Sequence, residues 1–120
     1  MTDTTGVAMN QEKTIPQETL NEIVRRIVKA AQPDRIILFG SAARGTMGRH
    51  SDIDLLVIKR GNFHRRRLAA EIHGHLSDVD YPFDVIVATP EDVERYGHSH
   101  ALVLKPALQE GKIVYDAAAV

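Results

Sequence analysis

The sequence predicts an α+β fold: a small mixed β-sheet of about four strands, with helices packed mainly on one face. Three observations lead to this prediction. Segments with helical and strand-like periodicity follow one another as helix, strand, strand, helix, strand, helix, strand. The clearest helical segments carry a single apolar stripe, which suits packing against one face of a sheet. The first two strands are separated by only about a dozen residues, which is too short for a crossover helix and argues against a doubly wound sheet.

The composition is that of one soluble domain. A chain of 120 residues is long enough for a single core, and 43% hydrophobic with 26% charged residues is an ordinary globular composition. We expect residues 1–14 to form a disordered tail and residues 15–120 to form one domain. Because neither a signal peptide nor an apolar run of roughly 20 residues is present, we expect a cytoplasmic protein without membrane contact.

The charge balance and the cysteine count exclude several classes of site. Fifteen basic and sixteen acidic side chains give a net charge of -1, so the surplus of positive charge typical of direct nucleic-acid binding is missing. The sequence has no cysteine, which excludes disulfides, zinc ribbons and thiol nucleophiles.

The first predicted helix covers residues 16–31. Its apolar residues recur at helical spacing: Leu20, Ile23, Val24, Ile27 and Val28. Pro16 suits a first-turn position. Pro33 ends the helix, because it disfavours helical dihedral angles at Gln32.

Two strands flank a glycine-rich segment. Residues 35–39 (RIILF) form a short β-branched and aromatic run that ends at glycine, and residues 52–59 (DIDLLVIK) form the second strand. Alternation along this second strand puts Asp52, Asp54 and Leu56 on one face.

The second half of the chain predicts a helix, a strand, further helix and a last strand. Within residues 63–79 an apolar stripe follows one helix face: Leu68, Ile72, Leu76 and Val79. Residues 83–88 form the third strand, and residues 89–92 (TPED) are typical of a capped helix start. Residues 100–111 predict a helix interrupted at Pro106, before the strand at residues 112–116.

The paired aspartates are the first candidate site. Asp52 and Asp54 start roughly 6.6 Å apart on one strand face, so their carboxylates can converge. Two such charges about 4 Å apart repel by on the order of 4 kcal/mol. A divalent cation removes this repulsion, and oxygen-only ligands favour Mg²⁺ or Mn²⁺. Asp84, on a strand predicted beside them, is a third candidate ligand, and a carboxylate here can also accept a proton from an attacking hydroxyl.

The segment before the aspartates supplies a candidate anion site. Gly40 allows close approach of the backbone to a ligand, and Ser41 at the start of a short helix presents its hydroxyl and free N–H groups. Arg44 adds positive charge close by.

These residues together resemble a known family. Gly40-Ser41, ten residues, then Asp52-Ile53-Asp54 is similar to the defining motif of the polymerase-β-like nucleotidyltransferase superfamily. The strings FGSAARG (residues 39–45) and SDIDLLV (residues 51–57) resemble its minimal nucleotidyltransferase (MNT) branch. The resemblance extends over residues 20–115 and implies the palm-like nucleotidyltransferase fold.

The resemblance also implies roles for individual residues. Asp52, Asp54 and Asp84 would be the catalytic and metal-binding carboxylates, with Mg²⁺ carrying the phosphates of ATP and Asp84 activating the acceptor hydroxyl. Gly40 and Ser41 would hold the β- and γ-phosphates. Arg44 would help to bind the nucleotide or would anchor the loop through a salt bridge.

Minimal members of the family resemble antitoxins whose partner is an all-helical HEPN ribonuclease toxin. The resemblance therefore implies transfer of AMP from ATP to a tyrosine hydroxyl of such a toxin, with the partner as acceptor. Two alternatives remain at this point. One is a non-catalytic antitoxin that neutralises its partner by occlusion, and the other is a small-molecule adenylyltransferase.

Several other polar residues have less specific explanations. His73 and His75 are two apart on a predicted helix and do not share a face, while His98 and His100 flank a serine, so surface positions explain all four better than zinc binding. His50 lies close enough to Asp52 to touch a nucleotide. The run at residues 65–67 (RRR) could contact an acidic partner or RNA, although a solvated helix face explains it better.

Overall fold

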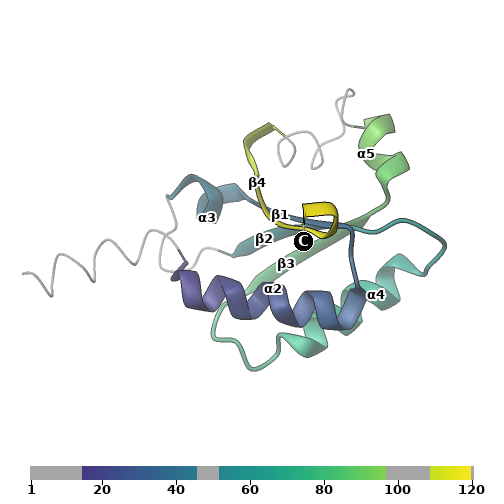
Figure 1. Ribbon diagram of the computed structural model, residues 1–120. Coiled ribbons are helices and arrows are strands. Elements are labelled where there is room, and N and C mark those ends of the chain that lie inside the picture. Colours follow the sequence, from purple (N-terminus) through teal and green to yellow (C-terminus); the bar gives the residue numbers. More distant parts are fainter. Residues whose placement is uncertain (1–14, 46–51, 97–108, 120) are drawn as a thin grey trace, which may run out of the picture.

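A computed structural model describes residues 15–45, 52–96 and 109–119 (Figure 1). The expected tail at residues 1–14 and most of the helix expected at residues 100–111 lie outside the described residues. The elements, in chain order, are α2 (Gln17–Ala31), β1 (Arg35–Phe39), α3 (Gly40–Arg44), β2 (Ile53–Ile58), α4 (Arg65–His75), β3 (Phe83–Ala88), α5 (Pro90–Tyr96), β4 (Lys112–Asp116) and the 3-10 helix η1 (Ala117–Ala119).

The four strands form one mixed sheet in the order β3-β2-β1-β4. β1 is antiparallel to both β2 and β4, whereas β2 and β3 run parallel. The antiparallel connection from β1 to β2, which contains α3, needs no crossover, and α4 provides the crossover between the parallel strands. Figure 1 shows α2 and α4 together below the sheet and α5 on the other side. The predicted α+β architecture is confirmed.

The core follows from the alternation of side chains along the strands. Alternate residues of β1, β2 and β3 pack with α2 and α4 in the larger cluster, whose fully buried members include Ile23, Ile27, Leu55, Val57 and Ile72. The opposite sheet face carries a smaller cluster, which consists of Ile37, Leu56, Ile58 and Ala88, with Phe39, Ile86 and Val93 packed against it. The sheet is therefore apolar on both faces, but its two main helices cover only one of them.

The helix ends agree with the sequence in part. Thr89 and Asp92 form the predicted capping box, since each accepts a hydrogen bond from the other's backbone N–H at 3.0–3.1 Å. Gln32 leaves the helical region before Pro33, with φ at 47°. Pro16 occupies the N-cap instead of the predicted first-turn position, because its carbonyl accepts the first helical hydrogen bond, from Leu20.

The second predicted helix is shorter than its apolar stripe. α4 ends at His75, so Leu76 and Val79 come after the helix, in the turn that leads toward β3. Both residues still pack into the larger cluster, because the turn continues over the same sheet face. The stripe therefore predicted burial correctly and helix length incorrectly.

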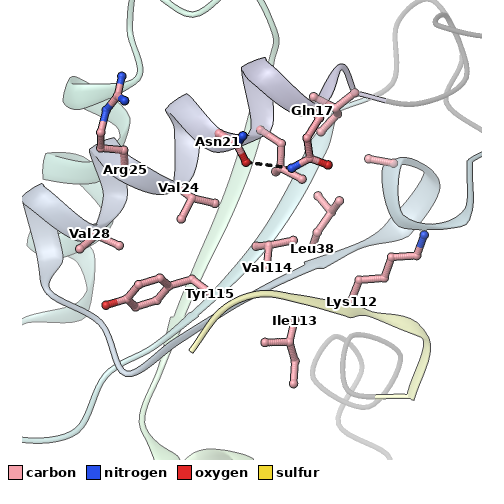
Figure 2. Close-up of a pocket in the computed structure, with 13 residues that line it drawn as sticks. Gln17, Asn21, Val24, Arg25, Val28, Leu38, Lys112, Ile113, Val114 and Tyr115 are labelled. Atoms are coloured by element: carbon pink, nitrogen blue, oxygen red, sulfur yellow. Dashed lines mark hydrogen bonds between the residues drawn. The ribbon is translucent and has the colours of Figure 1, made fainter. Parts of the chain in front are cut away.

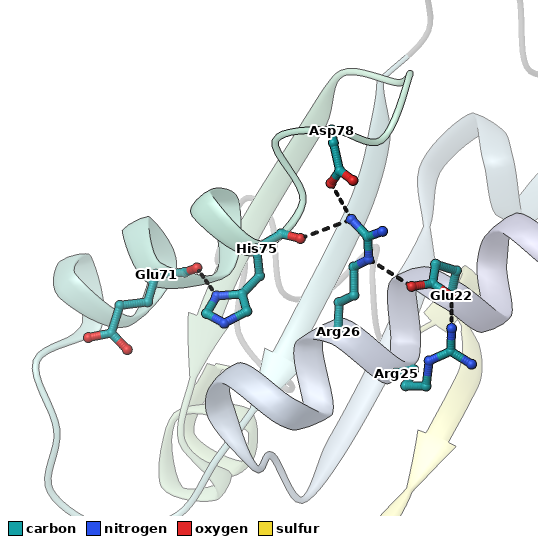
Figure 3. Close-up of polar contacts among 6 residues, drawn as sticks. All are labelled: Glu22, Arg25, Arg26, Glu71, His75 and Asp78. Carbon is teal, nitrogen blue, oxygen red and sulfur yellow. Dashed lines mark hydrogen bonds and ion pairs between the residues drawn. The ribbon is translucent and has the colours of Figure 1, made fainter.

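Arg26 connects α2 to the end of α4 (Figure 3). Its guanidinium pairs with Glu22 one turn earlier, donates to the carbonyl of His75 at 3.2 Å and pairs with Asp78. The Arg26 guanidinium lowers the pKa of the exposed Asp78 carboxyl. This bridge links α2 to the end of α4 beneath the sheet.

Among the residues that the structure describes, no helix is long and apolar enough to cross a membrane.

Candidate active site

Asp54 and Asp84 lie side by side on the sheet. They are register partners in the parallel pair β2–β3, and Phe39 is the partner of Asp54 on β1. Because directly paired residues share a face, these three residues form a row across the sheet, with α-carbons of neighbouring strands about 4.8 Å apart. The row lies on the face of the smaller cluster, opposite α2 and α4. We call Phe39, Asp54 and Asp84 the carboxylate row.

Asp52 stands immediately before β2 and is exposed, as is Asp84, whereas Asp54 is half-buried. Partial burial raises the pKa of the Asp54 carboxyl, and the charges of Asp84 and then Asp52 raise this pKa further, against an opposing effect of Arg44. The charges of Asp84 and Asp52 thus act on the carboxyl of Asp54. Their mutual repulsion is the condition that a bound cation relieves.

Gly40 is in direct contact with the carboxylate of Asp54. A Cβ placed on Gly40 would lie 2.2 Å from Asp54 Oδ2, and the backbone φ at Gly40 is +73°. Only glycine fits both the space and the conformation. The contact places the start of α3, with the half-buried Ser41 beside Gly40, directly against a carboxylate of the row.

Arg44, at the end of α3, forms an ion pair with Glu110 at 3.4 Å. Both side chains are about half exposed, at 52% and 54%. The sequence left open whether this arginine binds a nucleotide or anchors the loop, and the structure shows the anchoring contact. Glu110 could not be found from the sequence, since 66 residues separate it from Arg44 and no motif marks it.

The carboxylates of Asp52, Asp54 and Asp84 suit a hard cation, although their side chains are not arranged as a complete metal-binding site. In the described ranges, no three acidic or histidine side chains are close enough together to hold an ion. The charges of Asp84 and Asp52 nevertheless raise the pKa of Asp54, so both lie close enough to act on it electrostatically. Asp52 and Asp84 are exposed, so solvent surrounds both side chains and leaves them room to turn toward a shared ion. The three groups offer oxygen atoms alone, as Mg²⁺ and Mn²⁺ prefer.

The other polar candidates lie elsewhere or outside the described residues. His73 and His75 are exposed on α4, on the opposite sheet face from the carboxylate row. His50, His98 and His100 lie outside the described residues. In the predicted basic run, Arg65 pairs with Asp92 at 2.7 Å, while the two arginines after it are exposed.

A cavity of about 620 Å³ lies between α2 and the edge strand β4 (Figure 2). Its walls include Leu20 and Val24 of α2 and Val114 and Tyr115 of β4. These residues belong to the side of the sheet that packs with α2, so the cavity opens on the face opposite the carboxylate row.

Comparison with known proteins gives a family and several structural relatives. A family model described as "Nucleotidyltransferase domain" matches residues 18–114. No curated protein matches the chain. A candidate nucleotidyltransferase of Sulfolobus solfataricus is similar at 18% identity, with a TM-score of 0.58 over 84% of this chain and 80% of that chain.

Two further relatives are structures of toxin-antitoxin systems. A toxin-antitoxin with AMP-PNP has 25% identity and a TM-score of 0.58 over 82% of this chain and 74% of that chain. A complex of tri-AMPylated Shewanella oneidensis HEPN toxin with MNT antitoxin has 19% identity and a TM-score of 0.55 over 86% of this chain and 74% of that chain.

Proposed function

Because the chain belongs to the nucleotidyltransferase domain family, we propose that it transfers AMP from ATP to a protein hydroxyl in a Mg²⁺-dependent reaction. Its catalytic residues in this proposal are Asp52, Asp54 and Asp84. The acceptor is a tyrosine of a HEPN-type toxin, and the modification silences that toxin, so the protein acts as an antitoxin.

The observation that carries this proposal is the carboxylate row beside the Gly40 turn. Asp54 and Asp84 are register neighbours, and Gly40 touches the carboxylate of Asp54. Acidic groups and the turn that we propose to bind phosphate therefore meet at one end of the sheet, as nucleotidyl transfer would require. Neither feature alone would distinguish this site from an ordinary strand end.

Asp52, Asp54 and Asp84 would hold the divalent cation. When bound, Mg²⁺ neutralises charge on the phosphate oxygens of ATP. The raised pKa of Asp54 reflects negative charge that has no cationic partner strong enough to offset burial and repulsion. Oxygen atoms from three carboxylates match the ligand preference of this cation, and Mn²⁺ is an acceptable substitute.

Other residues of the chain bind the phosphates and accept the proton in this proposal. Gly40 and Ser41 hold the β- and γ-phosphates, with the Ser41 hydroxyl and backbone N–H groups as donors, and Arg44 adds positive charge. Asp84 accepts the proton of the acceptor hydroxyl. The acceptor oxygen forms a bond to the α-phosphorus, the bond from that phosphorus to the bridging oxygen breaks, and pyrophosphate leaves.

The assignment of the acceptor rests on the structural relatives. One of them is a tri-AMPylated HEPN toxin in complex with its MNT antitoxin, and another is a toxin-antitoxin with AMP-PNP. The same pairing in this protein would supply both the hydroxyl and the surface that positions it.

The test uses the wild-type chain, ATP carrying a labelled α-phosphate, Mg²⁺ and a helical HEPN-type protein as the candidate partner. We expect label to enter the partner, and we expect the Asp54→Asn variant to transfer none while keeping its circular-dichroism spectrum. Undiminished labelling by this variant would overturn the assignment of the site. Label that stays in ATP with the wild-type chain would overturn the proposed reaction.

A further inference from the structure

β3 forms one edge of the sheet. In the part of the chain that the structure describes, its only neighbouring strand is β2. Backbone groups alternate in direction along a strand, and the carbonyls of Pro82 and Ala88 accept hydrogen bonds from N–H groups at the two ends of β2, each at 2.9 Å. The odd-numbered residues between them therefore direct their N–H and C=O groups away from β2: Phe83, Val85 and Val87. We call this row of outward donors and acceptors the β3 edge.

The strand at the opposite edge, β4, is protected in ways that β3 is not. β4 begins at Lys112 and ends at Asp116, and its register with β1 contains an irregularity. Charges and bulges are common means by which an edge strand avoids pairing with another chain. β3 has a regular register with β2 and contains neither lysine nor proline, and its one charged residue is Asp84. The β3 edge is therefore the one suited to pairing with an added strand.

The proposed reaction requires the acceptor hydroxyl at this same edge. Asp84 takes the proton of that hydroxyl, so the hydroxyl oxygen must come within hydrogen-bond distance of the exposed Asp84 carboxylate. Gly40 and Ser41 follow β1, on the other side of Asp54 from β3. In-line attack puts the acceptor opposite the departing pyrophosphate, which Gly40 and Ser41 hold in the proposed function. The reaction itself thus brings a segment of the acceptor to β3.

We propose that the acceptor segment of the partner binds as an added strand on the β3 edge. This inference rests on the proposed function and adds to it the way in which the acceptor is recognised. The backbone of the segment bonds to the outward groups of Val85 and Val87, and its alternate side chains lie on the same sheet face as Asp84. In an antiparallel pairing, a tyrosine opposite the half-buried Ile86 lies about 7–8 Å diagonally from Asp84, a separation that an aromatic side chain can span.

This mode of binding places a requirement on the partner. The backbone groups inside a helix are bonded within that helix, so a helical segment cannot pair with a strand. In a helical partner, the acceptor tyrosine must therefore lie in an extended segment between helices or after the last one. The extended conformation around the tyrosine is part of what the β3 edge recognises.

Amide hydrogen exchange followed by NMR tests the inference on the full chain, alone and with an excess of a helical HEPN-type protein, in the absence of ATP. In the free protein we expect the N–H groups of Val85 and Val87 to exchange faster than those of Asp84 and Ile86, which face β2. The partner should slow exchange at Val85 and Val87 by at least about tenfold, since each N–H gains a hydrogen bond. Exchange along the outer side of β4 should not change.

A proline substitution tests the same edge through the kinetics. Val87→Pro removes an outward N–H, while the hydrogen bonds to β2 come from the residues on either side. Val87→Ala is the matched control, because it shortens the same buried side chain and keeps the N–H. Circular dichroism establishes that both variants are folded. We expect the KM for the partner in AMP transfer to be about tenfold higher in Val87→Pro than in Val87→Ala, with similar kcat and similar Mg-ATP affinity in the two.

Two results would contradict the inference and leave the proposed function intact. One is AMP transfer to the partner without slower exchange at Val85 and Val87 in the complex. The other is an equal KM for the partner in the two folded Val87 variants. Absence of AMP transfer by the wild-type chain would overturn the proposed function itself, and this inference with it.

Discussion

The carboxylate of Asp54 lies directly against the backbone of Gly40, where a Cβ would come within 2.2 Å of Asp54 Oδ2. This contact joins two parts of the sequence motif that are 14 positions apart. The conformation of the turn and the position of Asp54 therefore both require that residue 40 is a glycine, without a Cβ. Substitution at Gly40 tests this dependence.

Gly40→Ala is expected to remove at least about 100-fold of the activity, because the added methyl group must displace the carboxylate by more than an ångström. The left-handed backbone also costs about 1–2 kcal/mol in the free energy of unfolding. Gly61→Ala is the control, since Gly61 has φ at +102° and open space around its α-carbon. Chemical denaturation should show a loss of stability in both variants, and an adenylylation assay should show loss of activity in Gly40→Ala alone. Equal activities would contradict the role of the contact.

Asp54→Asn is expected to stabilise the metal-free protein at neutral pH. The pKa of Asp54 is raised by burial and by Asp84 and Asp52, above its ordinary value of 3.8. The folded state therefore holds this proton more tightly than the unfolded state, and stability falls as the pH rises from about 3.8 through the raised pKa. Thermal unfolding in a chelator should give Asp54→Asn the higher Tm at about pH 7 and no advantage below about pH 3.8. A wild-type protein that is more stable than Asp54→Asn at neutral pH would contradict this prediction.

Asp84→Asn separates the chemistry from nucleotide binding. If Asp84 accepts the proton of the acceptor hydroxyl, its loss lowers the rate of AMP transfer by about 10²–10⁴-fold. Because Asp52 and Asp54 still hold the cation and the asparagine amide keeps one oxygen atom, Mg-ATP affinity should fall far less than the transfer rate, by about tenfold at most. Single-turnover kinetics and calorimetry measure the two quantities. A transfer rate within experimental error of the wild type would remove Asp84 from the mechanism.

Arg44 and Glu110 can be separated in the same way. We expect Arg44→Gln to weaken ATP binding by about tenfold, through loss of a charge-assisted contact to phosphate. Glu110→Gln frees Arg44 and should leave ATP binding intact, with less than about 1 kcal/mol change in stability, as is usual for an exposed pair. Asp116→Asn, which breaks the 3.1 Å pair with Arg35, is the control for loss of a surface ion pair. Equal loss of ATP affinity in Arg44→Gln and Glu110→Gln would show that the arginine only anchors α3.

The sequence predicted most of the sheet because local patterns determine it. The bounds of β1, β3 and β4 agree with the predicted strands, and the Thr89 capping box is confirmed. The end of α4 was missed, because the stripe of buried residues continues through a turn where the backbone is no longer helical. The position of Pro16 was wrong by one residue for a similar reason, since both the N-cap and the first turn tolerate proline.

The candidate site was predictable in its composition and only partly in its geometry. Alternation along one strand predicts that Asp52 and Asp54 share a face, although β2 begins only at Ile53. The position of Asp84 beside Asp54 depended on β2 and β3 being neighbours. The contact between Gly40 and Asp54 and the pair between Arg44 and Glu110 depend on how separate segments approach each other. No single-sequence pattern encodes such approaches. The roles of all these residues stay predictions.

The most direct measurement of the central claim is the intact mass of the helical partner after incubation with this protein, ATP and Mg²⁺. The account predicts that the partner gains the mass of one or more AMP groups, and that Asp54→Asn and Gly40→Ala leave its mass unchanged. Inhibition of the partner without any gain in mass would contradict the account, because the protein would then act by covering its partner.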